Sequence, residues 1–170
     1  MNPDNAFNIL ILEDDPDQMD LLTNFALNEI KKFIDDDNTN DQLKPALRNI
    51  RIIRVTNYSA LQKVVTEHKN VLLALLDCNI PDTKTSAPHD QLVKTGHKIT
   101  GQHKSVDLVT KHLPDTPITM ISSLIRFQVL VTQYYNINFN LNINFIRKAD
   151  QLIIKKNIRY YIRQYLKTVI

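Results

Sequence analysis

The feature that most constrains this chain is an unbroken apolar run, Val71 to Leu76, which stops at the carboxylate of Asp77. A continuous apolar run of this length, bounded by turn residues, fits a strand buried on both faces of a parallel sheet. Asp77 would then lie where the strand emerges, at the carboxyl edge where open α/β sheets bind their ligands. A single aspartate there can also simply cap the next loop, so its meaning depends on what other strands bring to the same edge.

The composition fits one soluble globular domain. The chain has 170 residues, of which 43% are hydrophobic and 23% charged, and it can bury a sizeable core. No apolar run approaches the roughly 20 residues that span a bilayer, and residues 1–5 lack the basic and apolar regions of a signal peptide. The single cysteine, Cys78, excludes an internal disulfide and suits a reducing compartment, so we expect a cytoplasmic protein. With only 2 glycines, the chain has no glycine-rich loop for a phosphate or dinucleotide.

Charge is unevenly distributed along the chain. The net charge is +3, yet residues 1–41 contain 11 acidic and 2 basic side chains, whereas residues 42–170 contain 7 acidic and 19 basic ones. This segregation indicates an acidic site and a basic surface elsewhere. Basic residues recur every four positions near the C-terminus, at Lys155, Arg159, Arg163 and Lys167. Such a stripe is usually a solvated helix face; docking of an acidic protein is the alternative, and nucleic-acid binding is disfavoured because no DNA-reading motif follows.

Strands and helices are predicted to alternate five times. We expect strands at 7–12, 50–55, 71–77, 118–121 and 143–147. We expect helices beginning at 16, 59, 105, 124 and 151, the first marked by Asp15 and Pro16 and the second by Ser59 with Gln62. Residues 136–145 alternate asparagine with apolar side chains, which favours extended chain before the fifth strand. The five β-α units predict a parallel sheet with right-handed crossovers and helices on both faces.

Each strand of this sheet except the second would deliver a polar side chain to one edge. The first strand is followed by Glu13 and Asp14, the third ends at Asp77, the fourth at Ser122, and the fifth is followed by Lys148. Clustered carboxylates repel one another unless a cation is present, and oxygen ligands without cysteine or histidine favour a hard ion, most plausibly Mg²⁺. A carboxylate nucleophile, a divalent cation, a lysine and a hydroxyl together suit phosphoryl transfer.

At this point the chain resembles the receiver domains of two-component response regulators. Four segments carry the resemblance and occur in the right order over essentially the whole chain: Ile9–Asp15, Leu75–Pro81, Ile118–Ser123 and Phe145–Lys148. The resemblance implies a flavodoxin-like, doubly wound five-stranded sheet with strand order 2-1-3-4-5. It also implies a phosphoacceptor domain rather than an enzyme, acting in phosphorelay signal transduction.

The resemblance further implies a role for each site residue. Asp77 would accept the phosphoryl group, and Lys148 and Ser122 would contact it. Mg²⁺ would be bound by Asp14 and Asp77 directly, by Glu13 through water, and by the backbone carbonyl of Asn79. Ser122 and Phe145 would form the switch. The donor would be a sensor histidine kinase or a histidine phosphotransfer protein. A downstream protein partner would bind the face made by the fourth helix, fifth strand and fifth helix.

The chain departs from the family in three places. Two of them are insertions, at about 35–49 and 82–103. We expect one domain over residues 1–170, without an output domain. The second insertion emerges beside Asp77, so we hypothesise that it restricts access to the site. It contains His89, His97 and His103, whose irregular spacing does not match a transition-metal site. Ala149 follows Lys148 where the family usually has proline, which puts the local backbone geometry in question.

Three other kinds of protein share part of this pattern with a phosphoacceptor. A phosphatase of the haloacid-dehalogenase kind would need a second aspartate two residues after Asp77, where this chain has Asn79. Flavodoxin-like nucleotide binding needs a first loop that accepts phosphate, and Glu13 to Asp15 repels it. The strongest alternative is a pseudo-receiver, which keeps the fold and acts by protein docking without phosphorylation. The intact acidic residues, Ser122 and Lys148 argue against it.

Overall fold

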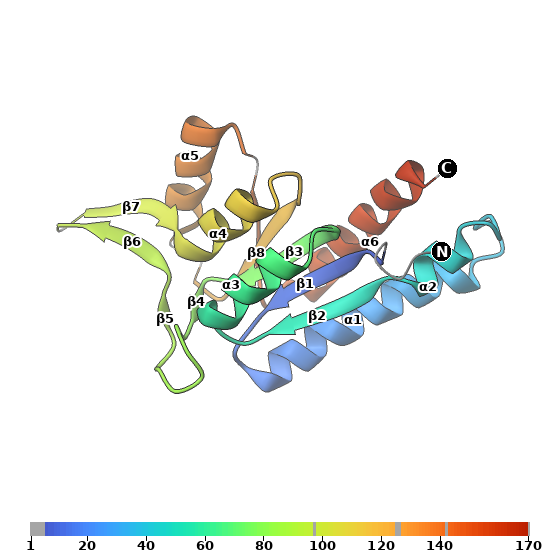
Figure 1. Ribbon diagram of the computed structural model, residues 1–170, viewed down its shortest axis with the longest axis horizontal. Coiled ribbons are helices and arrows are strands. Elements are labelled where there is room, and N and C mark those ends of the chain that lie inside the picture. The colour runs from blue at the N-terminus through green and yellow to red at the C-terminus, as the bar shows by residue number, and fades with distance from the viewer. Residues whose placement is uncertain (1–5, 97, 125–126, 142, 170) are drawn as a thin grey trace.

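A computed structural model describes residues 6–96, 98–124, 127–141 and 143–169 of the protein. Its centre is a five-stranded parallel sheet with the order β2-β1-β3-β8-β9 (Figure 1). The strands are β1 Asn8–Leu12, β2 Arg51–Val55, β3 Val71–Asp77, β8 Ile118–Ser122 and β9 Asn144–Arg147. This arrangement is the 2-1-3-4-5 order of the main strands, so the predicted fold class is confirmed. β3 lies in the middle, and all seven of its residues are buried as its apolar run predicts.

Helices cover both faces of the sheet. One face carries α1 Pro16–Asp35 and α6 Gln151–Thr168, and the other carries α3 Tyr58–Glu67, α4 Lys104–His112 and α5 Gln128–Phe139 (Figure 1). Alternate residues of β1 therefore enter different cores, because successive side chains of a strand point to opposite faces. Ile9 and Ile11 pack on the α1–α6 side, and Leu10 and Leu12 on the other.

Side-chain caps set the starts of α1 and α3. The Asp15 carboxylate accepts hydrogen bonds from the backbone N–H groups of Asp17 and Gln18, so α1 begins as predicted. The predicted cap of α3 at Ser59 is wrong by two residues, because the side chain of Asn57 caps the helix by accepting from the N–H of Ala60.

The interpretation of residues 136–145 as extended chain is wrong for its first part. α5 runs to Phe139 and ends at Asn140, whose φ of 51° is left-handed. Val131 and Tyr135, four residues apart, both point into the core, and burial at helical spacing outweighs the period-two pattern that follows. The strand itself begins at Asn144, close to the prediction.

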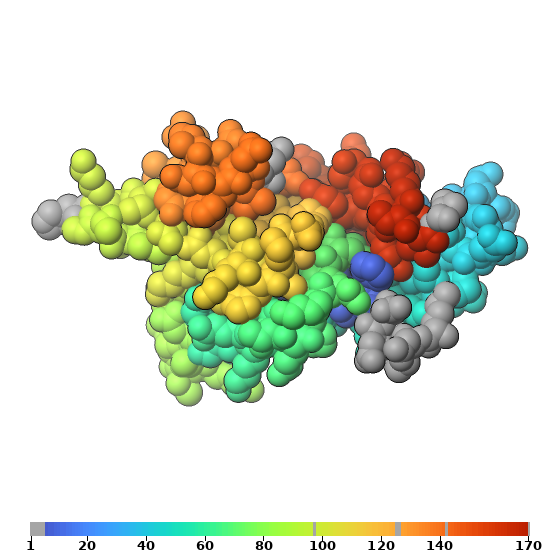
Figure 2. All heavy atoms as spheres, turned by 45° about the horizontal axis from the view of Figure 1, so that its top comes forward, coloured from blue at the N-terminus to red at the C-terminus, as the bar shows by residue number. Residues whose placement is uncertain are grey.

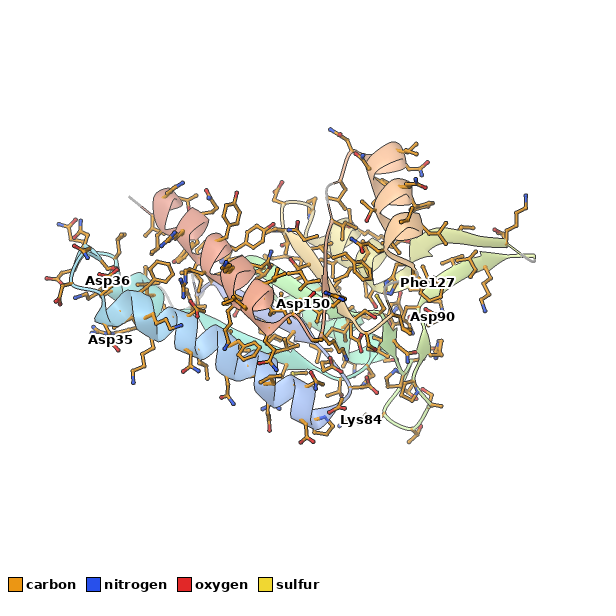
Figure 3. The ribbon with its side chains drawn as sticks, turned by 180° about the vertical axis from the view of Figure 1, so that it is seen from behind. Asp35, Asp36, Lys84, Asp90, Phe127 and Asp150 are labelled. Carbon is orange, nitrogen blue, oxygen red and sulfur yellow. The ribbon has the colours of Figure 1, made fainter. Side chains whose placement is uncertain are left out.

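The two expected insertions lie at opposite ends of the molecule. Residues 35–49 form a loop and the short helix α2 Lys44–Arg48. Seen from behind, Asp35 and Asp36 at the end of α1 lie far from Lys84 in the second insertion (Figure 3). Much of the N-terminal acidic excess is therefore at the edge of the sheet opposite Asp77.

The second insertion is not the irregular excursion that its polar sequence suggests. β4 Asn79–Ile80 pairs with β5 His89–Asp90, and β6 Leu92–Thr95 pairs with β7 Lys98–His103, both antiparallel. The β6–β7 hairpin projects from the body, with β7 against α5 (Figures 1 and 2). Gly101 permits this contact, since its φ is 81° and a Cβ there would lie 2.4 Å from the carbonyl oxygen of Leu130. No helix among the described residues is long and apolar enough to cross a membrane.

Candidate functional site

The carboxyl edge of the sheet brings the predicted acidic residues together. Glu13 and Asp14 follow β1, and Asp77 ends β3, the neighbouring strand. One carboxylate oxygen from each of the three lies within 4.8 Å of the others. Glu13 is fully buried and Asp77 nearly so, whereas Asp14 is half-buried. Glu13 and Asp77 are therefore shielded from solvent, and the cluster reaches solvent through Asp14.

Lys148 is the cation of this cluster. It follows β9, and its backbone N–H donates to the carbonyl of Ser122 on β8 at 3.1 Å. Its Nζ donates to Oε1 of Glu13 at 2.9 Å and to Oδ2 of Asp77 at 2.9 Å. Oε2 of Glu13 lies 2.7 Å from the same Nζ as part of the ion pair, but it has no hydrogen-bond partner of its own among the described residues. One lysine thus serves two buried carboxylates.

The ionisation of the cluster is set first by burial and only then by the neighbouring charges. Burial, and then repulsion from Asp77, raises the pKa of Glu13 to about 7. Burial also raises the pKa of Asp77 above its ordinary value, and Lys148 offsets only part of the effect. Burial lowers the pKa of Lys148, but attraction to Asp77 and Glu13 outweighs it, so that pKa ends above its ordinary value. A second cation would relieve the repulsion between the carboxylates.

The residues present fit a hard divalent cation on three grounds. Their donors are carboxylate oxygens, which Mg²⁺ prefers. Three carboxylates meet there while Lys148 is bonded to only two of them, and burial keeps the pKa values of Glu13 and Asp77 raised despite Lys148. Glu13, Asp14 and Asp77 are the residues that would hold such an ion.

The backbone after Asp77 is arranged so that the carbonyl of Asn79 is available to the site. The Asp77 carboxylate accepts from the N–H groups of Cys78, at 2.7 Å, and Asn79. Asn79 is opposite Asp90 in the β4–β5 ladder, and the N–H of Gln91 bonds the carbonyl of Cys78 at 3.2 Å. Asn79 and Asp90 therefore form a non-hydrogen-bonded pair, which turns the carbonyl of Asn79 away from β5.

The two predicted switch residues lie on neighbouring strands. Ser122 ends β8 and is buried, and its Oγ accepts from the N–H of Leu124 at 2.9 Å. Phe145 of β9 is opposite Met120 and is partly buried against the core beneath α3, α4 and α5. Their expected coupling stays a prediction.

Ala149 and the basic stripe can also be placed. The described part of the chain contains no cis peptide bond, so the backbone after Lys148 is trans. The basic stripe is only partly the solvated face that was expected, because Arg163 and Lys167 are exposed whereas Lys155 and Arg159 are half-buried. Arg159 donates to Oε2 of Glu29 on α1 at 2.6 Å, and Lys155 and Arg163 lie over the rings of Phe25 and Phe33. Much of the stripe packs on α1 because Arg and Lys stems cover apolar surface well.

Sequence reasoning missed the polar residues of the second insertion that support the site from below. His103 is fully buried, and its Nε2 lies 3.3 Å from the carbonyl of Cys78. The hydroxyl of Tyr135 on α5 contacts the backbone of His103. The spacing of the histidines carried no such signal: His89 is exposed, and His97 lies outside the described residues. The contacts appear only once β7 is placed beside β4 and α5.

Comparison with known proteins finds the fold but no close relative. No model of a known protein family matches the chain, and no curated protein matches it. Similar solved structures include the N-terminal domain of a response regulator/sensory box/GGDEF protein from Carboxydothermus hydrogenoformans, at 13% identity, with 96% of this chain and 99% of that chain covered and a TM-score of 0.55. An adenylate cyclase structure from Rhodopirellula baltica is also similar, at 14% identity, with 95% of this chain and 91% of that chain covered and a TM-score of 0.52.

A third similar structure is the P1 domain of CheA3 in complex with CheY6 from R. sphaeroides. It has 13% identity, with 93% of this chain and 98% of that chain covered, and a TM-score of 0.50. At these identities the likeness establishes the fold, and any function has to be argued from the residues at the carboxyl edge of the sheet.

Proposed function

We propose that this chain, which has the fold of response regulator receiver domains, accepts a phosphoryl group on Asp77 in a phosphorelay. The observation that carries the proposal is the meeting of Glu13, Asp14, Asp77 and Lys148 at one edge of the sheet, with the three carboxylates within 4.8 Å of one another and Lys148 bonded to two of them. No separate hydrolase acid is needed for this chemistry, which agrees with Asn79 in place of a second aspartate.

The proposed step is the displacement of a leaving group from phosphorus by a carboxylate oxygen of Asp77. The new P–O bond forms while the bond from phosphorus to an imidazole nitrogen of a phosphohistidine donor breaks. The departing electron pair stays on that nitrogen, and the product is an aspartyl phosphate. Lys148, already beside Asp77, provides positive charge for a phosphoryl oxygen.

Mg²⁺, when bound, would neutralise charge on the carboxylates and the transferring group. Glu13, Asp14, Asp77 and the backbone carbonyl of Asn79 are the groups that would hold it. Ser122 is proposed to hydrogen-bond to the phosphoryl group, and Phe145 to follow that change. Ser122 would have to exchange its bond from Leu124 for one to the phosphoryl group, which suits a residue at the end of a strand, beside a loop.

We propose a phosphohistidine protein as the donor and a protein as the downstream partner. The complex of a CheA3 P1 domain with CheY6 among the similar structures supports the first assignment. For the second, large apolar side chains are exposed on α5 and α6, at Val129, Ile137, Phe139, Leu152, Ile153 and Tyr160. Exposed apolar groups on adjoining elements mark protein-binding surfaces, and these elements flank β9, which carries Phe145.

The proposal is tested by labelling with a small phosphodonor such as acetyl phosphate, followed by intact-mass measurement. We expect Mg²⁺-dependent addition of one phosphoryl group to the wild type and none to Asp77→Asn. The matched control is Asp115→Asn, which changes an exposed aspartate before β8 and should label as the wild type does. Equal labelling of Asp77→Asn contradicts the assignment, and absence of labelling in the wild type favours the pseudo-receiver.

A further inference from the structure

We propose that His103, at the end of the second insertion, is a positioning residue for phosphorylation: it orients the Cys78–Asn79 peptide that holds the carboxylate of Asp77. This inference rests on the proposed function, because it concerns the geometry of the same site. The second insertion would then support the backbone next to Asp77, in addition to any effect that it has on access to Asp77.

The contact has one possible polarity. A carbonyl oxygen can only accept, so the Nε2 of His103, 3.3 Å from the carbonyl of Cys78, must carry the proton. The same carbonyl accepts from the N–H of Gln91 at 3.2 Å. Both donors belong to the insertion. The Cys78 carbonyl is therefore held by two donors, and both donor residues have no solvent exposure.

The other side of that peptide faces Asp77. A trans peptide is planar, and its C=O and N–H point in opposite directions, so the carbonyl of Cys78 and the N–H of Asn79 move as one rigid unit. The N–H of Asn79 helps to lower the pKa of the Asp77 carboxylate, next to the Cys78 N–H that donates to the same carboxylate at 2.7 Å. His103 thereby fixes the direction of a donor to the phosphoacceptor. It also fixes the start of Asn79, whose carbonyl turns away from β5.

His103 is itself held in place from two helices. The hydroxyl of Tyr135 on α5 accepts from the N–H of His103 at 2.8 Å and lies 2.9 Å from its carbonyl. The same hydroxyl lies 2.6 Å from Oδ1 of Asp107 on α4. A hydroxyl has one proton, and the carboxylate is the stronger acceptor, so Tyr135 donates to Asp107. With β7 seated on α5 at Gly101, the imidazole has little freedom to move.

The imidazole is suited to positioning and not to proton transfer. Burial lowers the pKa of His103 to about 4, so the ring is neutral at neutral pH. Its Nδ1 has no hydrogen-bond partner among the described residues, and it contacts a backbone carbonyl, not the reacting carboxylate. Its contribution is therefore to geometry.

The test compares His103→Gln with His103→Asn, which are both neutral and polar. The Gln amide can place a donor near the position of Nε2, whereas the Asn side chain is too short to reach the Cys78 carbonyl. His103→Leu removes the donor altogether. The control is His112→Leu in the last turn of α4, which leads to the edge of the sheet opposite Asp77. Two quantities are measured: the Mg²⁺ dissociation constant by calorimetry and the rate of labelling by acetyl phosphate.

We expect His103→Asn and His103→Leu to weaken Mg²⁺ binding and slow labelling by about tenfold, as loss of an outer hydrogen bond at a metal site does. His103→Gln should stay within about threefold of the wild type, and His112→Leu should match it.

Equal impairment of the Gln and Asn variants, or wild-type values for both, overturns the proposal. A wild type that binds Mg²⁺ without being labelled defeats the proposed function instead, while the Mg²⁺ affinities still decide the role of His103. A wild type that binds no Mg²⁺ contradicts both.

Discussion

The protein contains two buried glutamates in ion pairs, and they behave in opposite ways. Glu13 is fully buried and Glu29 on α1 is 1% exposed. Glu29 is bonded by Lys32 at 2.7 Å and Arg159 at 2.6 Å. Burial opposes its ionisation, but the two cations prevail and hold the pKa of Glu29 below its ordinary value. Glu13 instead shares Lys148 with Asp77, and its pKa is raised to about 7.

The difference shows which cluster is structural and which is incomplete. Two cations serve one carboxylate at Glu29, so nothing further is needed there. At Glu13, within the described part of the chain, Lys148 alone pairs with two buried carboxylates, and Asp14 lies beside them. Structural ion pairs are balanced, whereas sites that bind a cation accept a charge imbalance in the empty state. The imbalance, and not the mere presence of acidic residues, is what points to a metal at the carboxyl edge.

The largest effect should come from removing Lys148, the one cation paired with the site among the residues that the structure describes. Lys148→Met leaves Glu13 and Asp77 buried without a counter-charge, so we expect a loss of about 2–3 kcal/mol in the free energy of unfolding at pH 7.5 without Mg²⁺. The comparison is Arg159→Met, which should cost only about 1 kcal/mol because Glu29 keeps Lys32 and both of its cations are partly solvated. Urea denaturation measures both. An equal loss in the two variants would contradict the distinction between the clusters.

Neutralising each glutamate should shift stability in opposite directions. Glu13→Gln removes a charge that the fold disfavours, and we expect the variant to be about 2 kcal/mol more stable than the wild type at pH 8 without Mg²⁺. Glu29→Gln removes a charge that the fold favours and should be destabilised by about 1 kcal/mol. Both substitutions preserve shape, so each serves as the other's control. Destabilisation of both variants would show that Lys148 compensates Glu13 fully.

The stability difference between Glu13→Gln and the wild type should also depend on pH. The change expected over any one pH unit is smaller than the full difference. The pKa of Glu13 is about 7 in the folded protein and near its ordinary 4.5 when unfolded, so the folded state holds its proton more tightly. Its stabilising effect is complete below pH 4.5 and is lost as the pH rises to about 7. The advantage of Glu13→Gln should therefore grow across this window and then level off. The pKa of His103 is lowered to about 4, so its contribution to stability rises with pH between about pH 4 and 6.5. Because His103 is present in both proteins, this contribution cancels in the comparison. A difference that is constant with pH would contradict the raised pKa of Glu13.

Much of the fold and of the site could be predicted from sequence because parallel sheets impose a simple rule. Residues at the carboxyl ends of Val71–Asp77 and its neighbouring strands must share an edge, so the clustering of Glu13, Asp14, Asp77 and Lys148 followed from strand order alone. Local periodicity was less dependable. Residues 136–139 alternate like a strand, yet they end a helix whose register is set by the burial of Tyr135.

What could not be predicted depends on contacts between distant segments. The hairpins of the second insertion have no strong turn or periodic pattern, and Gly101 matters because of the carbonyl of Leu130, 29 positions later in the chain. The basic stripe was read from helical spacing, but spacing does not say that α1 lies against it. The bond from His103 to Cys78 spans 25 residues, and no local motif marks it.

The most direct test of the account is a Mg²⁺ titration of the free energy of unfolding. If the cluster at Glu13 lacks one cation, Mg²⁺ at about 100 times its dissociation constant should stabilise the wild type by about 2.7 kcal/mol. The effect should be largely lost in Asp14→Asn and Asp77→Asn, and retained in Glu29→Gln. A wild type whose stability does not respond to Mg²⁺, or an equal response in Asp77→Asn, would contradict the account.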